Sequence, residues 1–166
     1  DNAFAKFWFD FSQIFVNPWR GIYPNISSGR MIIESFSIVA MFFYILFSLV
    51  VSKSASSIFN DTRKQTIVDI VDSLFKIVEF ILITRFILKL TAASSASSFV
   101  TFIYSLSTFV YEPFASLVPA FKIDNIVFEL STLIAIIIII VLDIVTEQFV
   151  ISILEALFPD RKDQDS

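Results

Sequence analysis

The stretch that decides the fold is IVFELSTLIAIIIIIVLDIVTEQFVISI, residues 126–153. A helix that crosses the hydrocarbon core of a bilayer needs about 20 mostly apolar residues. This stretch is long enough, and the unbroken aliphatic run Ile136–Val141 lies at its centre. Two further stretches meet the same requirement, at about residues 31–51 and 73–91. The sequence therefore predicts three membrane-spanning helices.

The composition of the whole chain agrees with that prediction. The chain has 166 residues, of which 56% are hydrophobic and 17% are charged, and its mean hydropathy is +0.80. Soluble domains contain about 45–50% apolar and about 25% charged residues. We therefore expect an integral membrane protein whose first partner is the lipid bilayer. The expected fold class is all-α: a polytopic transmembrane helical protein.

Several classes of function lack the residues that they need. The chain has no histidine and no cysteine, which excludes thiolate chemistry, haem histidines and the usual zinc sites. Its two glycines cannot build a phosphate-binding loop, and a net charge of −4 argues against nucleic acid as a partner. We expect no cofactor, no metal and no catalytic residues, and hence no enzyme. An intramembrane carboxylate pair of Asp72 and Asp143 is the weakest alternative, because no motif surrounds these residues.

Two aromatic segments, residues 4–16 and 99–111, are too short to span a bilayer. Each is followed by a proline that stops a helix, Pro18 and Pro113. Their Phe, Trp and Tyr content predicts amphipathic helices that lie at the membrane interface. The alternative is a soluble loop folded over the bundle. The remaining segments are a polar loop at residues 53–66 and a charged tail at residues 158–166.

An internal repeat emerges when the chain is compared with itself at an offset of 95 residues. The ungapped comparison aligns Phe4 with Phe99, Phe7 with Phe102, Ser12 with Ser107, Pro18 with Pro113, Pro24 with Pro119 and Glu34 with Glu129. Two prolines and a glutamate in one register favour a duplication. The first repeat would occupy residues 1–52 and lack its opening helix, which we expect before Asp1. The second would occupy residues 67–157. The alternative is a three-span protein with a chance match.

Charged residues occur inside the predicted spans, where an unpaired charge costs at least roughly 2.5–3.5 kcal/mol. Matching depths along the second and third spans pairs Arg85 or Lys89 with Glu129, and Lys76 with Asp143. Such pairs can fix helix register or line a proton or ion path, and some of these charges can instead face another subunit. The structural intramembrane charges are Glu34, Lys76, Glu79, Arg85, Lys89, Glu129 and Asp143.

The segment from Arg85 to Glu147 resembles the YggT family of small bacterial and plastid membrane proteins. The resemblance is carried by RFILKL from Arg85, SSFVTFIYSLS at 97–107, PFASLVP at 113–119 and FELSTLIAI at 128–136. The family turn resembles T-x-P-x-x-x-P-x-R-x-x-x-P. The turn residues matched here are Pro113, Phe114 and Pro119 in the second copy, and Pro18, Arg20 and Pro24 in the first. Ala115 stands where the second copy would have the arginine.

The resemblance implies a membrane protein without established catalytic activity, linked to osmotic tolerance, cell division or the assembly of photosynthetic complexes. We therefore expect a non-enzymatic scaffold or accessory subunit that binds other integral membrane proteins. The alternative is a small ion or solute channel or transporter. The expected location is a bacterial inner membrane or a plastid-type membrane. Basic residues slightly favour the 52–65 side, which places this loop and the C-terminus in the cytoplasm.

Overall fold

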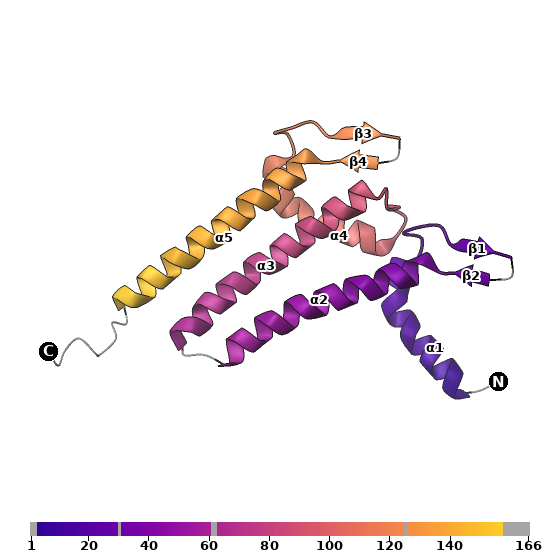
Figure 1. The fold of residues 1–166 in the computed structure, drawn as a ribbon, viewed down its shortest axis with the longest axis horizontal. Coiled ribbons are helices and arrows are strands. Elements are labelled where there is room, and N and C mark those ends of the chain that lie inside the picture. The colour runs from indigo at the N-terminus through magenta and orange to yellow at the C-terminus, as the bar shows by residue number, and fades with distance from the viewer. Residues whose placement is uncertain (1–2, 30, 61–62, 125, 158–166) are drawn as a thin grey trace.

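The computed structural model describes residues 3–29, 31–60, 63–124 and 126–157. Within these ranges the chain is mostly helical, and two short β-hairpins interrupt the helices (Figure 1). In chain order the elements are α1 (Ala3–Val16), η1 (Asn17–Trp19), β1 (Ile26–Ser28), β2 (Met31–Ile33), α2 (Ser35–Asn60), α3 (Arg63–Leu90), α4 (Ser98–Tyr111), η2 (Glu112–Phe114), β3 (Phe121–Ile123), β4 (Ile126–Phe128) and α5 (Leu130–Leu157).

Helix α3 is the centre of the arrangement. It packs against α5 on one side and α2 on the other, and it also contacts α4, which crosses behind it (Figure 1). Helix α1 precedes α2 in the chain. Its last turn lies near the start of α2, and the helix extends away from the other helices (Figure 1). The three long helices therefore form one layer, and the two short helices lie across or outside it.

Two apolar clusters hold these helices together. The larger cluster surrounds Trp19, which is only 1% exposed and stacks on Phe99 with ring centroids 3.6 Å apart. Since Trp19 belongs to the first turn and Phe99 to α4, this contact joins the two halves of the chain. The smaller cluster joins α3 to α5 through Leu82, Ala135 and Ile139. Burial of such side chains is the main stabilising term for the packing.

The two hairpins correct the predicted starts of the first and third spans. Residues 31–33 and 126–128 are strands, so the helices begin only at Ser35 and Leu130. Each antiparallel pair closes over two residues, because Ser28 pairs with Met31 and Ile123 with Ile126. Gly29 and Asp124, the first residues of these turns, have φ values of +61° and +53°, which glycine and aspartate tolerate best. The all-α expectation was therefore incomplete.

The polar loop expected at residues 53–66 is mostly helix. Helix α2 continues to Asn60 and α3 begins at Arg63, while residues 61–62 lie outside the described residues. The stretch contains no glycine or proline, the two residues that most disfavour a helix. The helix that contains the second predicted span, expected from residue 73, begins ten residues earlier, at Arg63. The tail predicted at residues 158–166 lies outside the described residues.

Among the described residues, two helical segments are long and apolar enough to cross a membrane: Ser35–Ser52 in α2 and Leu130–Leu157 in α5. Only 11% and 17% of their apolar windows are buried, unlike the core helix of a soluble protein. Helix α3 does not meet the same criterion, because charged residues recur along it. The findings support membrane association, and the second predicted span, residues 73–91 in α3, remains a prediction.

The order of elements is the same in both halves of the chain. A short helix, a 3-10 turn, a hairpin and a long helix occur first from α1 to α2 and again from α4 to α5. Each element of the second set starts 95 residues after its counterpart, from Ala3 and Ser98 at the first to Ser35 and Leu130 at the last. The helices expected at 4–16 and 99–111 are α1 and α4.

Candidate functional site

The most buried ion pair among the described residues lies between α3 and the start of α5. Arg85 Nε donates to Glu129 Oε2 at 3.0 Å, and Arg85 Nη2 lies 3.4 Å from Glu129 Oε1. Both side chains are 8% exposed. Two hydrogen bonds from one guanidinium to one carboxylate fix its orientation as well as its position. Glu129 also precedes the first turn of α5, where the helix dipole favours a negative charge.

Neighbouring groups complete the surroundings of Arg85. Its Nη1 donates to Ser107 Oγ at 3.0 Å and to the Tyr104 carbonyl at 3.5 Å, both in α4. Its guanidinium lies 4.0 Å from the centroid of the Tyr111 ring, within the range of a cation–π contact. On the other side, Thr132 Oγ1 donates to Glu129 Oε2 at 2.8 Å. This set of contacts ties α3, α4 and α5 together at one point.

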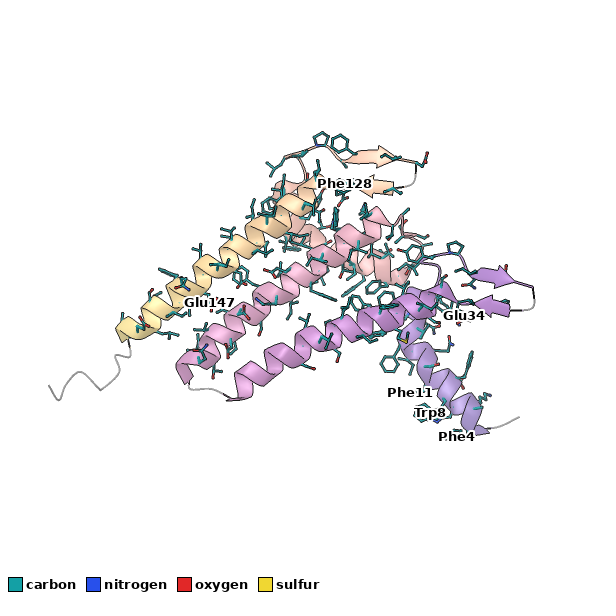
Figure 2. The ribbon with its side chains drawn as sticks, viewed as in Figure 1. Phe4, Trp8, Phe11, Glu34, Phe128 and Glu147 are labelled. Atoms are coloured by element: carbon teal, nitrogen blue, oxygen red, sulfur yellow. The ribbon has the colours of Figure 1, made fainter. Side chains whose placement is uncertain are left out.

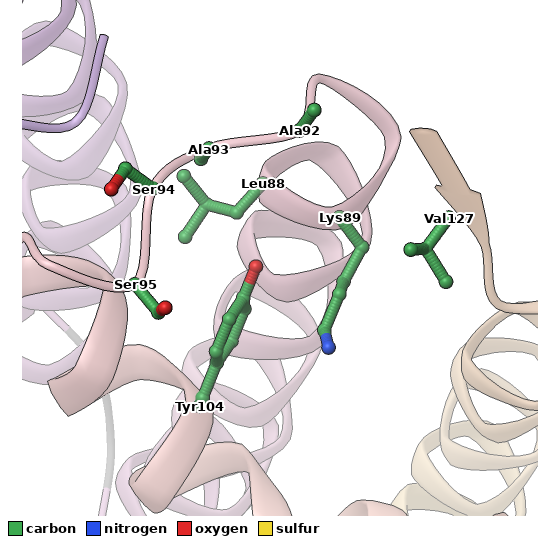
Figure 3. A pocket seen from close by; sticks show the side chains of 8 residues that line it. All are labelled: Leu88, Lys89, Ala92, Ala93, Ser94, Ser95, Tyr104 and Val127. Atoms are coloured by element: carbon green, nitrogen blue, oxygen red, sulfur yellow. The ribbon is translucent and has the colours of Figure 1, made fainter. Parts of the chain in front are cut away.

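Lys89 forms the outer edge of the same group. Its Nζ lies 3.4 Å from Glu129 Oε1 and 4.6 Å from the centroid of the Tyr104 ring. Figure 3 shows these two side chains next to each other in an open cavity of about 470 Å³ at the end of α3. Burial, and then the negative charge of Glu129, raises the pKa of Tyr104 from 10.0 to about 12. At neutral pH Tyr104 is therefore an uncharged ring that lies beside the two cations Arg85 and Lys89.

A second, more open ion-pair group joins the middle of α3 to the middle of α5. Lys76 Nζ lies 2.6 Å from Asp72 Oδ1 and 3.3 Å from Asp143 Oδ2. The Lys76 side chain is 40% exposed, whereas that of Asp143 is 8% exposed. Glu79, predicted with this group, forms no ion pair with any residue that the structure describes. Asp143 Oδ1, Asp69 Oδ2 and Ser73 Oγ are buried and accept or donate no hydrogen bond there.

Glu34 is placed differently from the other predicted intramembrane charges. It is exposed, and Ser37 Oγ donates to its Oε2 at 3.1 Å. No described basic side chain lies within ion-pair distance of it. The structure thus has both of the pairs expected for Lys76 and for Arg85 or Lys89, but leaves Glu34 outside them.

The predicted turn residues build the connections rather than a binding site. Pro18 and Pro113 lie inside the 3-10 turns η1 and η2, and Pro24 and Pro119 precede the hairpins. Phe114 packs against the smaller cluster. Arg20 is exposed, and its Nη2 donates to Gln13 Oε1 at 2.5 Å. The Pro18 carbonyl accepts a hydrogen bond from Ser97 Oγ at 2.9 Å, which attaches the first turn to the start of α4.

Sequence reasoning missed the groups that α4 contributes to the Arg85 site. The repeat aligns Ser107 with Ser12, which draws attention to Ser107, but this alignment does not predict a contact with an arginine. Tyr104 and Tyr111 lie seven residues apart, on one face of α4. In a chain with 21 phenylalanines, this spacing is easily read as part of an aromatic face.

The contacts described here hold helices together, and they define a class: a mostly helical, membrane-associated protein whose buried charges are paired across helices. The model of the CCB3/YggT family matches residues 64–153, from the start of α3 to near the end of α5. The chain therefore belongs to the CCB3/YggT family. No curated protein and no solved structure matches the chain. In the residues that the structure describes, no three His, Cys, Asp or Glu side chains form a group able to hold a metal ion.

Proposed function

We propose that the protein is a non-enzymatic membrane scaffold or accessory subunit that binds other integral membrane proteins through apolar helix faces. The observation that carries this proposal is the aromatic surface of α1. Phe4, Trp8, Phe11 and Phe15 form a row of ring contacts along this helix, with centroids 5.4–6.1 Å apart. Figure 2 shows the first three of them on a helix that extends away from the bundle.

Exposure of that row supports a binding role. The exposed fractions along the row are 69% for Phe4, 51% for Trp8, 44% for Phe11 and 47% for Phe15. Contiguous apolar surface of this kind marks a contact with lipid or with another protein. Aromatic side chains also provide large contact areas for little conformational entropy. An aromatic helix beside the bundle is therefore suited to hold a partner at the membrane surface.

The state of the buried charges supports the same proposal. Arg85, Lys89 and Glu129 are engaged with one another and with α4. A buried charge that has lost its partner is strongly destabilising, so this group serves to keep the helices in register. Groups occupied in this way are not free to catalyse a reaction. The scaffold proposal needs no further chemistry from them.

The proposal includes a membrane arrangement. Helices α2, α3 and α5 span the bilayer, with the charges of α3 neutralised against α5, and α1 and α4 lie at the interface. The two halves derive from a duplication, which is supported by the common element order. The connection between α2 and α3 faces the cytoplasm of a bacterial inner membrane or the equivalent side of a plastid-type membrane.

Photo-crosslinking tests this proposal in native membranes. Benzoylphenylalanine is introduced at Phe7 in α1 and, as an exposed control outside α1, at Phe109, which is 92% exposed. We expect the Phe7 variant to yield one discrete protein adduct that the Phe109 variant does not yield. Adducts with lipid alone at Phe7, or the same mixture of proteins from both positions, would contradict the scaffold role.

One observation favours a channel or transporter as the second candidate. Asp69, Ser73 and Asp143 carry buried oxygens without hydrogen-bond partners among the described residues, along the α3–α5 contact. Such oxygens are rare unless water or an ion reaches them. If this is a conduction path, purified protein in liposomes should pass protons or monovalent cations, and Asp143→Asn should reduce the flux at least about tenfold. Flux equal to that of empty liposomes removes this candidate.

A further inference from the structure

We propose that the cavity at the end of α3 binds a phosphate group, with Lys89 as its cationic ligand. The inference goes beyond the scaffold function proposed above and does not depend on it. The cavity has a volume of about 470 Å³ and lies between α3, the loop that follows it, α4 and β4 (Figure 3). This volume is within the range of about 300–1,000 Å³ that is usual for small-molecule sites. All of its lining residues lie inside residues 64–153, the part that the family model matches.

The charges beside the cavity do not cancel. Arg85 and Lys89 carry two positive charges, and among the described residues Glu129 is the one carboxylate within ion-pair distance of either. Arg85 engages both oxygens of Glu129, at 3.0 and 3.4 Å. The group of three therefore keeps one positive charge in excess. Because an uncompensated charge close to hydrocarbon is costly, a bound phosphodiester, which carries one negative charge, would neutralise the group.

Lys89 carries the excess charge at the open edge of the group. Its Nζ lies 3.4 Å from Glu129 Oε1 and 4.6 Å from the centroid of the Tyr104 ring. It donates no hydrogen bond to any residue that the structure describes, and its side chain is 27% exposed. An ammonium group has three hydrogens to donate. Lys89 can therefore bind an anion in the cavity while it stays beside Glu129.

Three hydroxyl groups line the cavity together with Lys89: those of Ser94, Ser95 and Tyr104 (Figure 3). Ser94 Oγ accepts a hydrogen bond from the backbone of Ala96 at 3.2 Å and keeps its own hydrogen for another acceptor. The hydroxyls of Ser95 and Tyr104 form no hydrogen bond with described residues. A phosphate group has more oxygens than a carboxylate, so it can accept from the ammonium and from several hydroxyls at once. This set of donors favours phosphate.

Carbonyl oxygens would repel an anion, so the turn that ends α3 matters for the site. The carbonyls of Leu88 and Lys89 accept from the backbone N–H groups of Ala93 and Ala92, at 2.9 and 3.3 Å. Ala92 has a φ of +52°, in the left-handed region that commonly ends a helix. Lys89 itself stands in the last turn of α3, where a cation offsets the negative end of the helix dipole. The turn thus pairs these carbonyls and leaves the Lys89 ammonium beside the cavity.

Two sources of phosphate fit this chemistry: the headgroup of a phospholipid and a soluble phosphate. The position of the cavity favours the lipid. In the membrane arrangement proposed above, α3 ends and α4 lies at the interface, where lipid headgroups are found. Basic cavities between membrane helices are typical sites for anionic headgroups. Ala92 and Val127 add an apolar part to the lining, which suits the glycerol and the first carbons of the acyl chains.

Native mass spectrometry of the full chain in detergent tests the inference. The probe is dioctanoylphosphatidylglycerol, and dioctanoylglycerol, which has the same chains without the phosphate, is the control ligand. We expect one saturable phosphatidylglycerol adduct per chain and a much weaker adduct with dioctanoylglycerol. Lys89→Gln should weaken the phosphatidylglycerol adduct about tenfold or more, and Tyr104→Phe about threefold. Lys6→Gln, which removes an exposed lysine from α1, is the matched control and should leave the affinity unchanged.

Inorganic phosphate, added as a competitor, distinguishes the two sources. Displacement of the lipid by an equal concentration of inorganic phosphate would support the phosphate site and identify a soluble phosphate as its ligand. Resistance to that concentration, together with the loss in Lys89→Gln, would support the site and identify the lipid.

The opposite results would overturn the inference. They are an affinity that Lys89→Gln leaves unchanged, equal affinities for dioctanoylglycerol and phosphatidylglycerol, or no saturable adduct with the cooperatively folded chain. Lys89→Gln also removes a contact with Glu129, so the thermal unfolding of each variant is measured. If Lys89→Gln fails to fold, Tyr104→Phe, which keeps the ring and every charge, decides in its place, and an unchanged affinity there would contradict the site. None of these results affects the crosslinks expected at Phe7, on which the scaffold proposal depends.

Discussion

Glu34 and Glu129 each follow a hairpin and precede a long helix, yet Glu129 is 6% exposed and paired with Arg85, whereas Glu34 is exposed and bonded only to Ser37 among the described residues. The two glutamates differ in exposure because of the helices packed around them and not because of the residue type. Helix α3 covers Glu129, and no described helix covers Glu34 in the same way. The buried ion pair of the second half therefore has no counterpart among the described residues of the first half.

The Arg85–Glu129 pair gives the first prediction. Glu129→Gln keeps the size of the side chain but leaves the buried guanidinium less compensated, at a cost of about 1–3 kcal/mol in the free energy of unfolding. Adding Arg85→Gln should recover part of this loss, because no buried cation then faces a neutral amide. Reversible unfolding in mixed micelles measures the free energy of unfolding of the unchanged chain, the two single variants and the double variant. A double variant whose loss equals the sum of the two single losses would show that the residues do not interact.

Trp19 gives the second prediction, since it joins the first turn to α4 through Phe99. Trp19→Ala should cost about 3–5 kcal/mol in unfolding free energy, as for other large buried side chains. Trp8→Ala is the control, because Trp8 is half exposed, and should cost no more than about 0.5 kcal/mol. Tryptophan fluorescence checks the environment: Trp8→Phe should leave a blue-shifted emission that resists acrylamide quenching. Ready quenching in that variant would place Trp19 outside the core.

Tyr104 gives a prediction about pH. Its pKa is raised from 10.0 to about 12 in the folded protein, so the folded state holds the phenol proton more tightly than the unfolded state. The resulting stabilisation is complete below pH 10 and is lost as the pH rises towards 12. In an optical titration at pH 10.5, Tyr104→Phe should barely change the tyrosinate absorbance, whereas at pH 12 it should lower it. If Tyr104→Phe already lowers the tyrosinate absorbance at pH 10.5, the pKa of Tyr104 is not raised and this prediction is wrong.

Membrane orientation gives the fourth prediction. The chain has no cysteine, so a single introduced thiol reports one position. Ser56→Cys, near the end of α2, should react with an impermeant maleimide only after the membrane is opened, whereas Lys122→Cys in β3 should react from outside intact cells. Labelling of Ser56→Cys from outside would reverse the proposed orientation.

Much of the fold follows from length and hydrophobicity, because α2 and α5 each contain an apolar stretch long enough to cross a membrane. The pairing of Lys76 with Asp143, and of Arg85 or Lys89 with Glu129, follows from depth, because a charge inside an apolar helix needs a partner at the same depth. The hairpins were missed for a physical reason. The strands that directly precede the long helices, β2 and β4, are apolar, so hydropathy merges them with α2 and α5, and only the short turns at Gly29 and Asp124 mark the boundary.

The contacts from α4 were beyond sequence reasoning. Ser107, Tyr104 and Tyr111 meet Arg85 because α4 crosses behind α3, and α4 also packs through Phe99 on Trp19, which is far away in the sequence. The helical extension through residues 53–60 was missed because serine and lysine are common in loops, although neither breaks a helix.

The central claim is that this chain works by holding a partner in the membrane. Native mass spectrometry of the tagged protein, released from membranes with its surrounding lipid, tests that claim most directly. The account predicts a particle heavier than the 18.9 kDa chain by the mass of a different protein in a fixed ratio. Particles of 18.9 kDa, or of its whole-number multiples alone, would contradict it.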